Sequence, residues 1–284
     1  MIVSYRSREL LRDCLRSLRE HPPRVPLRVT VVDNDSRDGT AGMVSAEFPE
    51  AHLIAAERNL GFSAANNRAM RGGESDYVLA LNPDTRVTEG ALDRLLELMD
   101  TRPDIGICGC RLELEDGSFD HAAKRSFPTI AGSLGHFTGV GRGARQGALS
   151  QYRAPGVEAG PVDAINGAFM LMRRATLDKI GLFDEGFWMY MEDLDLCYRC
   201  WEAGSVVWYE PSVTVVHIKH GSSGDYRTPR LNYAFHYGMY RFYRKHYAAS
   251  RNAFVNAAVY AGIAGKLGLS VARSAVARRV LHLV

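Results

Sequence analysis

Residues 27–40 read LRVTVVDNDSRDGT, and this segment sets the fold class. Leu27–Asp33 is a compact apolar run with the length of a strand, and it ends in a carboxylate. Asn34–Gly39 is rich in turn-forming residues, and Thr40–Phe48 has the pattern of a helix. The segment therefore predicts a buried strand, a tight turn and a helix in succession.

The same order of strand and helix recurs on both sides of this segment. Apolar runs predict further strands at Ile2–Tyr5, His52–Ala56, Tyr77–Leu81 and Ile105–Cys110. Helical spacing of apolar residues predicts helices at Arg8–Arg19, Ala64–Met70 and Glu89–Asp100. Repeated strand–helix–strand units predict an α/β fold with a mostly parallel sheet flanked by helices.

The second half of the chain is less regular. Gly117–Val162, rich in Gly, Ser and Arg, predicts a long loop with some helix. After an apolar run at Ala164–Met172, the patterns predict helices at Arg174–Ile180 and Glu192–Ala203 and short strands at Val206–Tyr209 and Val213–His217. We expect one domain over residues 1–225 and a helical C-terminal extension over residues 226–284.

Charge is distributed unevenly between these two parts. The extension holds ten Lys and Arg residues and no Asp or Glu, whereas residues 1–225 hold 25 basic against 32 acidic side chains. A basic tail on an acidic body suggests an anionic partner surface, either membrane or nucleic acid.

Composition excludes several classes of protein. With 284 residues, 46% hydrophobic and 24% charged side chains, the chain is not a disordered, collagenous, coiled-coil or polytopic membrane protein. We expect no signal peptide at the N-terminus, where arginines come early and no apolar stretch follows. Five cysteines, an odd number, suggest free thiols in a reducing cytoplasm.

Polar clusters follow two of the predicted strands, where ligands of open α/β sheets bind. Asp33 and Asp35 could accept hydrogen bonds from a nucleobase or ribose, or could simply form a turn. Asn82-Pro83-Asp84 offers Asp84 as an oxygen ligand for a divalent cation, although this tripeptide is also good turn chemistry.

Two further groups could carry chemistry. Glu192, Asp193 and Asp195 open a helix directly after an aromatic run, so one of them could be a general base, or they could merely complement the helix dipole. His217 ends a strand and could complete a metal site or contact a phosphate, although a lone His is more often structural.

Two other patterns are expected to be misleading. Gly139–Ala144 fits a loose dinucleotide pattern, but no strand precedes it and no helix follows it. The pairs Cys108/Cys110 and Cys197/Cys200 lie in a predicted strand and a predicted helix rather than in the turns that carry zinc ligands. We expect these cysteines to pack as small apolar side chains.

Six strings, taken together in order, resemble the inverting family 2 glycosyltransferases, in particular the bacterial rhamnosyltransferase-like branch. The strings are IVSYRSRELLRDCLRSL (2–18), VVDNDSRDGT (31–40), RNLGFSAANNRAM (58–70), LALNPDTRV (79–87), INGAFMLMRRATLDKIGLFDEGFWMYMEDLDLCYR (165–199) and VVHIKHGSSG (215–224). The resemblance covers most of residues 2–224. It implies a GT-A-like nucleotide-diphospho-sugar transferase fold and a catalytic domain over residues 1–225.

The resemblance also implies roles for individual residues. Those matching the part that holds the base and ribose are Ser4, Tyr5, Asp33 and Asp35, and those matching the loop over the nucleotide are Asn59, Gly61, Phe62 and Asn66. Asn82-Pro83-Asp84 stands where the family has an Asp-x-Asp motif, with Asn82 in place of the first Asp. Asp84 and His217 would hold Mg²⁺ or Mn²⁺. Glu192 and Asp193 match the pair that activates the acceptor, with Asp193 as the base.

The function implied is transfer of a hexose, from dTDP-L-rhamnose or another nucleotide hexose, to a glycan or lipid-linked glycan of the cell envelope. A sugar nucleotidyltransferase and a non-catalytic nucleotide-sugar-binding module remain as alternatives. The former normally has a Gly-rich basic loop after its first strand, whereas Tyr5–Glu9 has no Gly.

The extension would place the enzyme peripherally on the inner face of the cell membrane. We expect Ala253–Ala272, interrupted by Asn256 and Lys266 and weakened as a helix by its glycines, not to cross the bilayer. A helix in the headgroup plane, with its cations toward anionic lipid, is favoured over nucleic acid binding. The alternative is a pair of basic helices packed on the catalytic domain.

Overall fold

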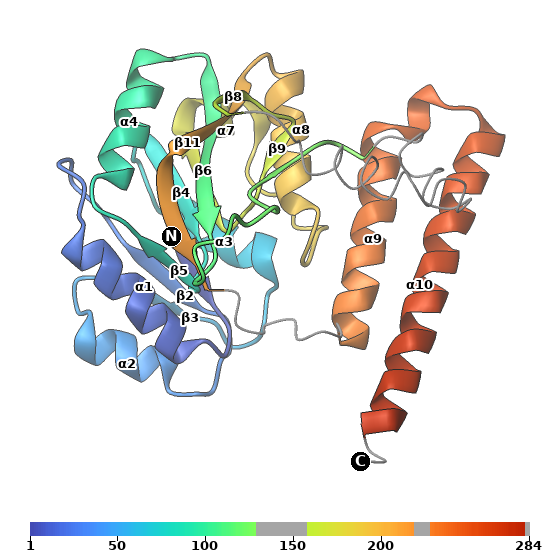
Figure 1. The fold of residues 1–284 in the computed structure, drawn as a ribbon, viewed down its shortest axis with the longest axis horizontal. Coiled ribbons are helices and arrows are strands. Elements are labelled where there is room, and N and C mark those ends of the chain that lie inside the picture. The colour runs from blue at the N-terminus through green and yellow to red at the C-terminus, as the bar shows by residue number, and fades with distance from the viewer. Residues whose placement is uncertain (129–157, 219–227, 282–284) are drawn as a thin grey trace.

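The computed structural model describes residues 1–128, 158–218 and 228–281. One nine-stranded sheet forms the centre, in the order β3-β2-β1-β4-β10-β6-β11-β5, with β8 paired to β11 (Figure 1). Its strands are β1 (Ile2–Ser4), β2 (Thr30–Asp33), β3 (His52–Ala55), β4 (Tyr77–Leu81), β5 (Thr85–Val87), β6 (Ile105–Glu113), β8 (Gly160–Pro161), β10 (Phe169–Arg173) and β11 (Val206–His217). The short strands β7 (Lys124–Arg125) and β9 (Ala164–Ile165) pair separately.

The α-helices of the described residues cover the sheet and extend beyond it. They are α1 (Arg8–Glu20), α2 (Thr40–Glu47), α3 (Phe62–Met70), α4 (Ala91–Thr101), α7 (Arg174–Ile180), α8 (Glu192–Glu202), α9 (Pro229–His246) and α10 (Ala253–Leu281). In α1, Leu11, Cys14, Leu15 and Leu18 are buried at helical spacing, so the helix packs one apolar stripe on the core.

The sheet has a parallel half and a mixed half. β1 is parallel to β2 and β4, and β2 is parallel to β3. β10 then runs antiparallel to both β4 and β6, and β5 runs antiparallel to β11. The prediction of a mainly parallel sheet flanked by helices is confirmed, while the reversal of β10 and the existence of β5 were not predicted.

Several predicted boundaries needed correction. The strand expected over Leu27–Asp33 begins only at Thr30, and the two strands expected within residues 206–217 form the single strand β11. An irregular register between Glu210 and Thr214 explains why the pattern looked like two strands. Gly139–Ala144 and most of the predicted loop Gly117–Val162 lie outside the described residues.

All five cysteines are buried free thiols. Cys108 and Cys110 lie in β6, and Cys197 and Cys200 lie in α8. Burial raises the pKa of the Cys200 thiol to about 12, so this side chain remains a neutral group in the core.

The extension forms an antiparallel helical hairpin. α9 begins with Pro229 after Thr228, whose hydroxyl accepts a hydrogen bond from the Leu231 N–H at 3.3 Å. α9 is attached to the rest of the protein, whereas α10 packs on α9 and forms the outermost layer (Figure 1). The expected boundary between residues 225 and 226 lies outside the described residues and stays a prediction.

α10 is a continuous helix of 29 residues, so the glycines of its first half do not interrupt it. Its segment Ala253–Arg273 is long and apolar enough to cross a membrane by length and composition alone. Only 6% of its apolar window is buried, so most of this segment is not part of the protein core.

Candidate active site

The carboxyl ends of β1, β2 and β4 bring the first group of predicted residues together. Ser4 pairs with Asp33 in the ladder, and the Asn34 N–H donates to the Ser4 carbonyl at 2.8 Å. Asp33 accepts the Ser36 N–H at 3.1 Å, and Asp35, with φ +64°, accepts from Arg37 at 2.7 Å. These carboxylates therefore do shape the turn, and a role in nucleotide binding stays a prediction.

Tyr5 is the most accessible of the predicted nucleotide-binding residues. It follows β1 directly, with its side chain exposed and the Arg6 guanidinium 5.2 Å from the ring centre. A planar ring at the carboxyl edge of the sheet can stack on a nucleobase. The structure thus leaves the predicted role of this ring open to test.

The loop before α3 is tied to the end of β2. The Asn59 side-chain carbonyl accepts from the Gly61 N–H at 2.9 Å and from the Asn34 amide at 3.3 Å. Asn34 also accepts from the Leu60 N–H at 2.8 Å. Sequence reasoning gave Asn34 no role of its own, yet this side chain fixes the predicted nucleotide loop.

The same loop touches the segment that precedes α8. The Phe62 N–H donates to the Trp188 carbonyl at 2.7 Å, and Gly61 has φ +83°. A Cβ atom at Gly61 would lie 2.3 Å from the Trp188 oxygen, so only glycine fits there. Asn66, also predicted, donates to the Phe62 carbonyl at 3.0 Å inside its own helix.

Asp84, His217 and Asp120 form a line of side chains, of which His217 and Asp120 are buried and Asp84 is partly buried. His217 Nδ1 lies 2.9 Å from Asp120 Oδ2, and His217 Nε2 lies 3.4 Å from Asp84 Oδ1. Burial lowers the pKa of His217, but its interactions with Asp120 and Asp84 outweigh burial and raise the pKa to about 9. Asp120 was missed in the sequence, and it orients the imidazole as carboxylates do for metal-binding histidines.

Asp84 and His217, the two predicted metal ligands, lie next to each other. Asp84 Oδ1 is buried and makes no hydrogen bond, although it faces Nε2 of the histidine. Two neighbouring ligands of an octahedral ion at about 2.1 Å lie about 3 Å apart, close to this spacing. Within the part of the chain that the structure describes, no group of three or more His, Cys, Asp or Glu side chains could hold a metal. Mg²⁺ commonly takes one or two carboxylates and completes its shell with substrate phosphates.

Glu192 and Asp193 begin α8 as a buried pair of carboxylates. Asp193 Oδ2 forms an ion pair with Arg125 of β7 and accepts the Gly167 N–H at 3.1 Å. Asp193 Oδ1 accepts the Leu194 N–H at 2.8 Å. These three contacts hold the Asp193 carboxyl group in one orientation beside a cation.

Glu192 is in a different state. Burial raises its pKa to about 8, and the neighbouring charge of Asp193 adds to the increase. Its Oε2 atom is buried and makes no hydrogen bond. A buried carboxyl group with a raised pKa beside a second acidic side chain is typical of acid–base sites.

One backbone segment joins the acidic pair to the metal side of the site. Gly167 donates to Asp193, and the next residue, Ala168, accepts the Asn82 N–H at 2.9 Å. Asn82 and Asp193 are therefore separated by a single loop between β9 and β10. Gly167 lies in a string that was quoted for the resemblance, but the glycine itself was given no role.

The segment before α8 holds two non-glycine residues with positive φ. Tyr190 has φ +71° and Met191 has φ +72°. Such conformations cost of order 1–3 kcal/mol each and persist where the surroundings impose them. Here the strained residues directly precede Glu192, so the chain conformation places the acidic pair.

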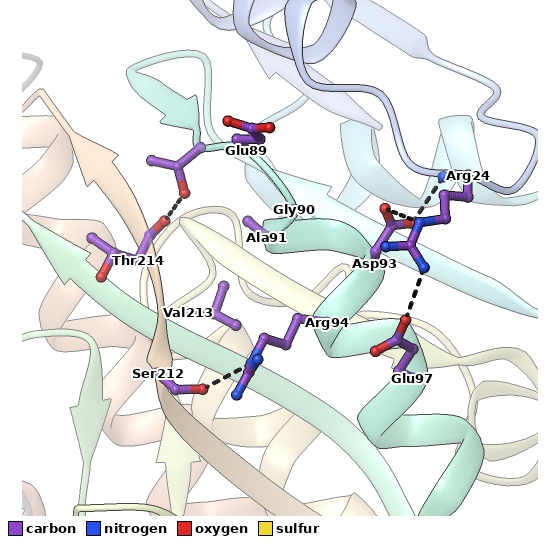
Figure 2. Close-up of a pocket in the computed structure, with 11 residues that line it drawn as sticks. Arg24, Glu89, Gly90, Ala91, Asp93, Arg94, Glu97, Ser212, Val213 and Thr214 are labelled. Carbon is purple, nitrogen blue, oxygen red and sulfur yellow. Dashed lines mark hydrogen bonds and ion pairs between the residues drawn. The ribbon is translucent and has the colours of Figure 1, made fainter.

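A pocket of ≈ 340 Å³ lies elsewhere, between the start of α4 and β11 (Figure 2). Its polar groups bond to one another: Arg24 pairs with Asp93 and Glu97, and Arg94 donates to Ser212 at 3.4 Å. None of the predicted site residues lines it. We assign this pocket no role.

Comparisons with known proteins identify the family of this chain. The family model described as glycosyl transferase family 2 matches residues 1–181. The chain is 32% identical over 225 residues to an N-acetylglucosaminyl-diphospho-decaprenol L-rhamnosyltransferase of Mycobacterium tuberculosis, covering 75% of this chain and 72% of that protein. It is 26% identical over 199 residues to rhamnosyltransferase WbbL of Escherichia coli K12, covering 68% and 74%.

Solved structures show the same fold at low sequence identity. A mannosyltransferase of Pyrobaculum calidifontis in complex with GDP-Man and Mn²⁺ aligns with a TM-score of 0.58 at 16% identity, covering 97% of this chain and 74% of that one. GalNAc-T7 with UDP, GalNAc and Mn²⁺ aligns with a TM-score of 0.60 at 15% identity, covering 85% and 48%. The GT-A-like fold implied by the resemblance is confirmed. The chain belongs to glycosyl transferase family 2, and it is a glycosyltransferase.

Proposed function

We propose that this glycosyltransferase moves L-rhamnose from dTDP-rhamnose to a glycan or lipid-linked glycan of the cell envelope, with inversion at the anomeric carbon. One observation carries the proposal. The single loop Asn166–Ala168 contacts both the buried base candidate Asp193 and Asn82 of the Asn82-Pro83-Asp84 turn. Asp193 can thus act on an acceptor hydroxyl while the Asn82-Pro83-Asp84 turn lies close to the departing diphosphate.

Asp193 is the proposed general base. The Arg125 guanidinium pairs with Asp193 and holds its carboxyl group in one position, as a positioned general base requires. Glu192, with its raised pKa, holds a proton near neutral pH and is less suited to the role. In the reaction, the acceptor oxygen bonds to the anomeric carbon, its proton passes to Asp193, and the bond to the diphosphate breaks.

Asp84 and His217 are the proposed ligands of Mg²⁺ or Mn²⁺. When bound, such an ion offsets the charge that develops on the departing diphosphate. Asp120 keeps the imidazole oriented through Nδ1, which leaves Nε2 directed toward Asp84. Solved proteins of the same fold were crystallised with Mn²⁺, which supports the use of a divalent metal.

The names of the relatives support the donor and acceptor. Two are rhamnosyltransferases, and one of these has a name that specifies a diphospho-decaprenol acceptor. We therefore propose a lipid-linked acceptor and peripheral contact with the membrane through the extension.

A panel of nucleotide sugars with a GlcNAc-diphospho-lipid acceptor tests the proposal. We expect release of nucleoside diphosphate that depends on the acceptor and is fastest with dTDP-rhamnose. Release of pyrophosphate from a nucleoside triphosphate and a sugar phosphate would instead support a nucleotidyltransferase. Tight donor binding without release of any product would support a binding module.

A further inference from the structure

The exposed large apolar side chains of the described residues are concentrated on the helical hairpin. Tyr233 and Tyr237 of α9 and Phe254, Leu269 and Val271 of α10 are exposed. Phe254 is 88% and Leu269 is 62% accessible, and they lie about 22 Å apart along the helix. Contiguous apolar surface is typical of interaction sites, so the residues between these two side chains decide whether they belong to one face.

The outward face of α10 has no polar side chain over most of its length. Between Ala253 and Ala272, every exposed residue is Ala, Gly, Val, Leu or Phe. The polar residues of this segment are partly buried: the Asn256 side chain accepts from the Tyr243 hydroxyl at 2.7 Å, and Ser270 donates to Asn232 at 2.9 Å. The helix therefore separates its residues into a bonded inner face and an apolar outer face.

Several cations of the extension contact acidic or aromatic side chains of the same chain. Arg241 pairs with Asp184 at 2.8 Å, and Lys245 pairs with Asp195 at 2.7 Å. Arg230 lies over the Trp188 ring at 4.0 Å. Arg273, by contrast, is exposed where the apolar face ends. Contact with a partner must therefore depend more on the apolar face than on the ten cations.

We propose that the outward face of α10 lies in the boundary between headgroups and acyl chains of an anionic membrane, with the helix parallel to the bilayer plane. Such a boundary accepts an apolar face, and its anionic headgroups attract Arg251 and Arg273, which are exposed at the two ends of that face. A second copy of the chain is disfavoured as the occupant, because these two arginines would meet no acidic residue on another extension.

The contacts between the helices oppose a spanning orientation. Asn256 and Ser270 hold α10 on α9 at points 14 residues apart, about 21 Å along the helix. α9 is in turn fixed to the catalytic domain by His246, which lies 2.8 Å from Asp195. Crossing the bilayer would break these bonds and place Lys266 among the acyl chains.

This surface is connected to the active site through α9. The Tyr190 ring packs on Phe235 at 5.8 Å, and a Cβ atom at Gly238 would lie 2.9 Å from the Tyr190 carbonyl. Tyr190 belongs to the strained segment that precedes Glu192. The proposed membrane face thus lies one helix away from the acceptor side of the site, which deepens the proposed use of a lipid-linked acceptor and rests on that proposed function.

Vesicle flotation with the full chain tests the inference. We expect the protein to float with phosphatidylcholine vesicles containing phosphatidylglycerol and to remain partly bound in 0.5 M NaCl. The double variant Phe254→Glu/Leu269→Glu should bind at least tenfold more weakly. The matched control is Val25→Glu/Leu27→Glu, at side chains 51% and 42% exposed on another part of the surface, and it should float like the wild type.

Equal flotation of the two double variants, or none of the wild type, would overturn the inference. A concentration-dependent dimer in light scattering that the Phe254→Glu/Leu269→Glu variant loses, without flotation of the wild type, would assign the face to a second copy. Circular dichroism should show that all variants keep their helices. Because flotation needs neither donor nor turnover, its failure is distinct from failure of the proposed transferase reaction, and Asp193→Asn should float normally.

Discussion

Replacing Asp193 with Asn removes the proposed base and at the same time breaks a buried ion pair. The Arg125 and Asp193 side chains are only 14% and 9% exposed. In the variant, Arg125 loses its carboxylate partner and keeps the Ile165 carbonyl at 3.3 Å. The substitution should therefore affect both catalysis and stability, and the two effects can be separated.

The structure sets the size of each effect. Breaking a buried ion pair costs about 3–5 kcal/mol, because it leaves an uncompensated charge in the interior. At about 2–4 °C per kcal/mol, Asp193→Asn should melt roughly 6–20 °C below the wild type. Loss of a positioned general base should lower kcat by about 10²–10⁴-fold.

A double variant separates the two effects. Arg125→Met/Asp193→Asn has no buried charge at this position, so we expect it to regain most of the lost melting temperature but none of the lost kcat. The melting temperature is measured by calorimetry and kcat by release of nucleoside diphosphate. Both are measured for the two variants, for Arg125→Met alone and for the wild type, which makes a double-mutant cycle. Near-normal turnover by either variant that carries Asp193→Asn would refute the assignment of the base. A double variant no more stable than Asp193→Asn would refute the electrostatic explanation.

The contacts of the site support three other predictions. Asp120→Asn should weaken Mn²⁺ binding by about 10–100-fold in a titration calorimeter, because His217 loses its orienting carboxylate, and unchanged affinity would contradict this role. The raised pKa of Glu192 means that the folded protein holds a proton between about pH 4.5 and 8, so stability falls as the pH rises through this range. The melting temperature of Glu192→Gln should therefore rise relative to that of the wild type as the pH increases from 5 to 8.5. A difference in melting temperature that stays constant over this range would contradict the raised pKa of Glu192. Gly61→Ala should cost at least 1–3 kcal/mol in denaturant unfolding, whereas the control Gly42→Ala, with no atom within 4 Å of the added Cβ, should not be destabilised.

Much of the fold could be predicted because each strand of the parallel half has its own apolar run and its own following helix. The direction of β10 could not, because the apolar run at Ala164–Met172 reads alike in either direction. β5 has only three residues directly after a turn, too few to show any period. Both features depend on tertiary pairing, which local patterns do not encode.

The site could be predicted only where its residues stand in local motifs. Asp84, His217, Glu192 and Asp193 lie in motifs that were quoted from the sequence, and the resemblance gave them roles. Asp120 and Arg125 lie in none of these motifs, and they reach their partners across 97 and 68 residues of sequence. No sequence pattern relates positions so far apart, so the roles of Asp120 and Arg125 could be identified only from the folded structure.

The extension, too, has one feature that was expected from the sequence and one that depends on tertiary contacts. Packing of the extension on the catalytic domain was the expected alternative, and the first helix does pack there, since the Phe242 ring lies 5.8 Å from the Tyr198 ring of α8. Gly265 and Gly268 were expected to weaken the second helix, at about 1 kcal/mol each. α10 nevertheless continues through them, because its contacts with α9 supply stabilisation that sequence propensity does not include.

Proton NMR of the product as it forms, with dTDP-rhamnose and a soluble GlcNAc-diphospho-lipid analogue, tests the central claim most directly. A single displacement with Asp193 as base predicts that the first product detected has the anomeric configuration opposite to that of the donor. One nucleoside diphosphate should be released per bond formed. Retention of the donor configuration, or release of nucleoside diphosphate without a new glycosidic bond, would contradict the proposed mechanism.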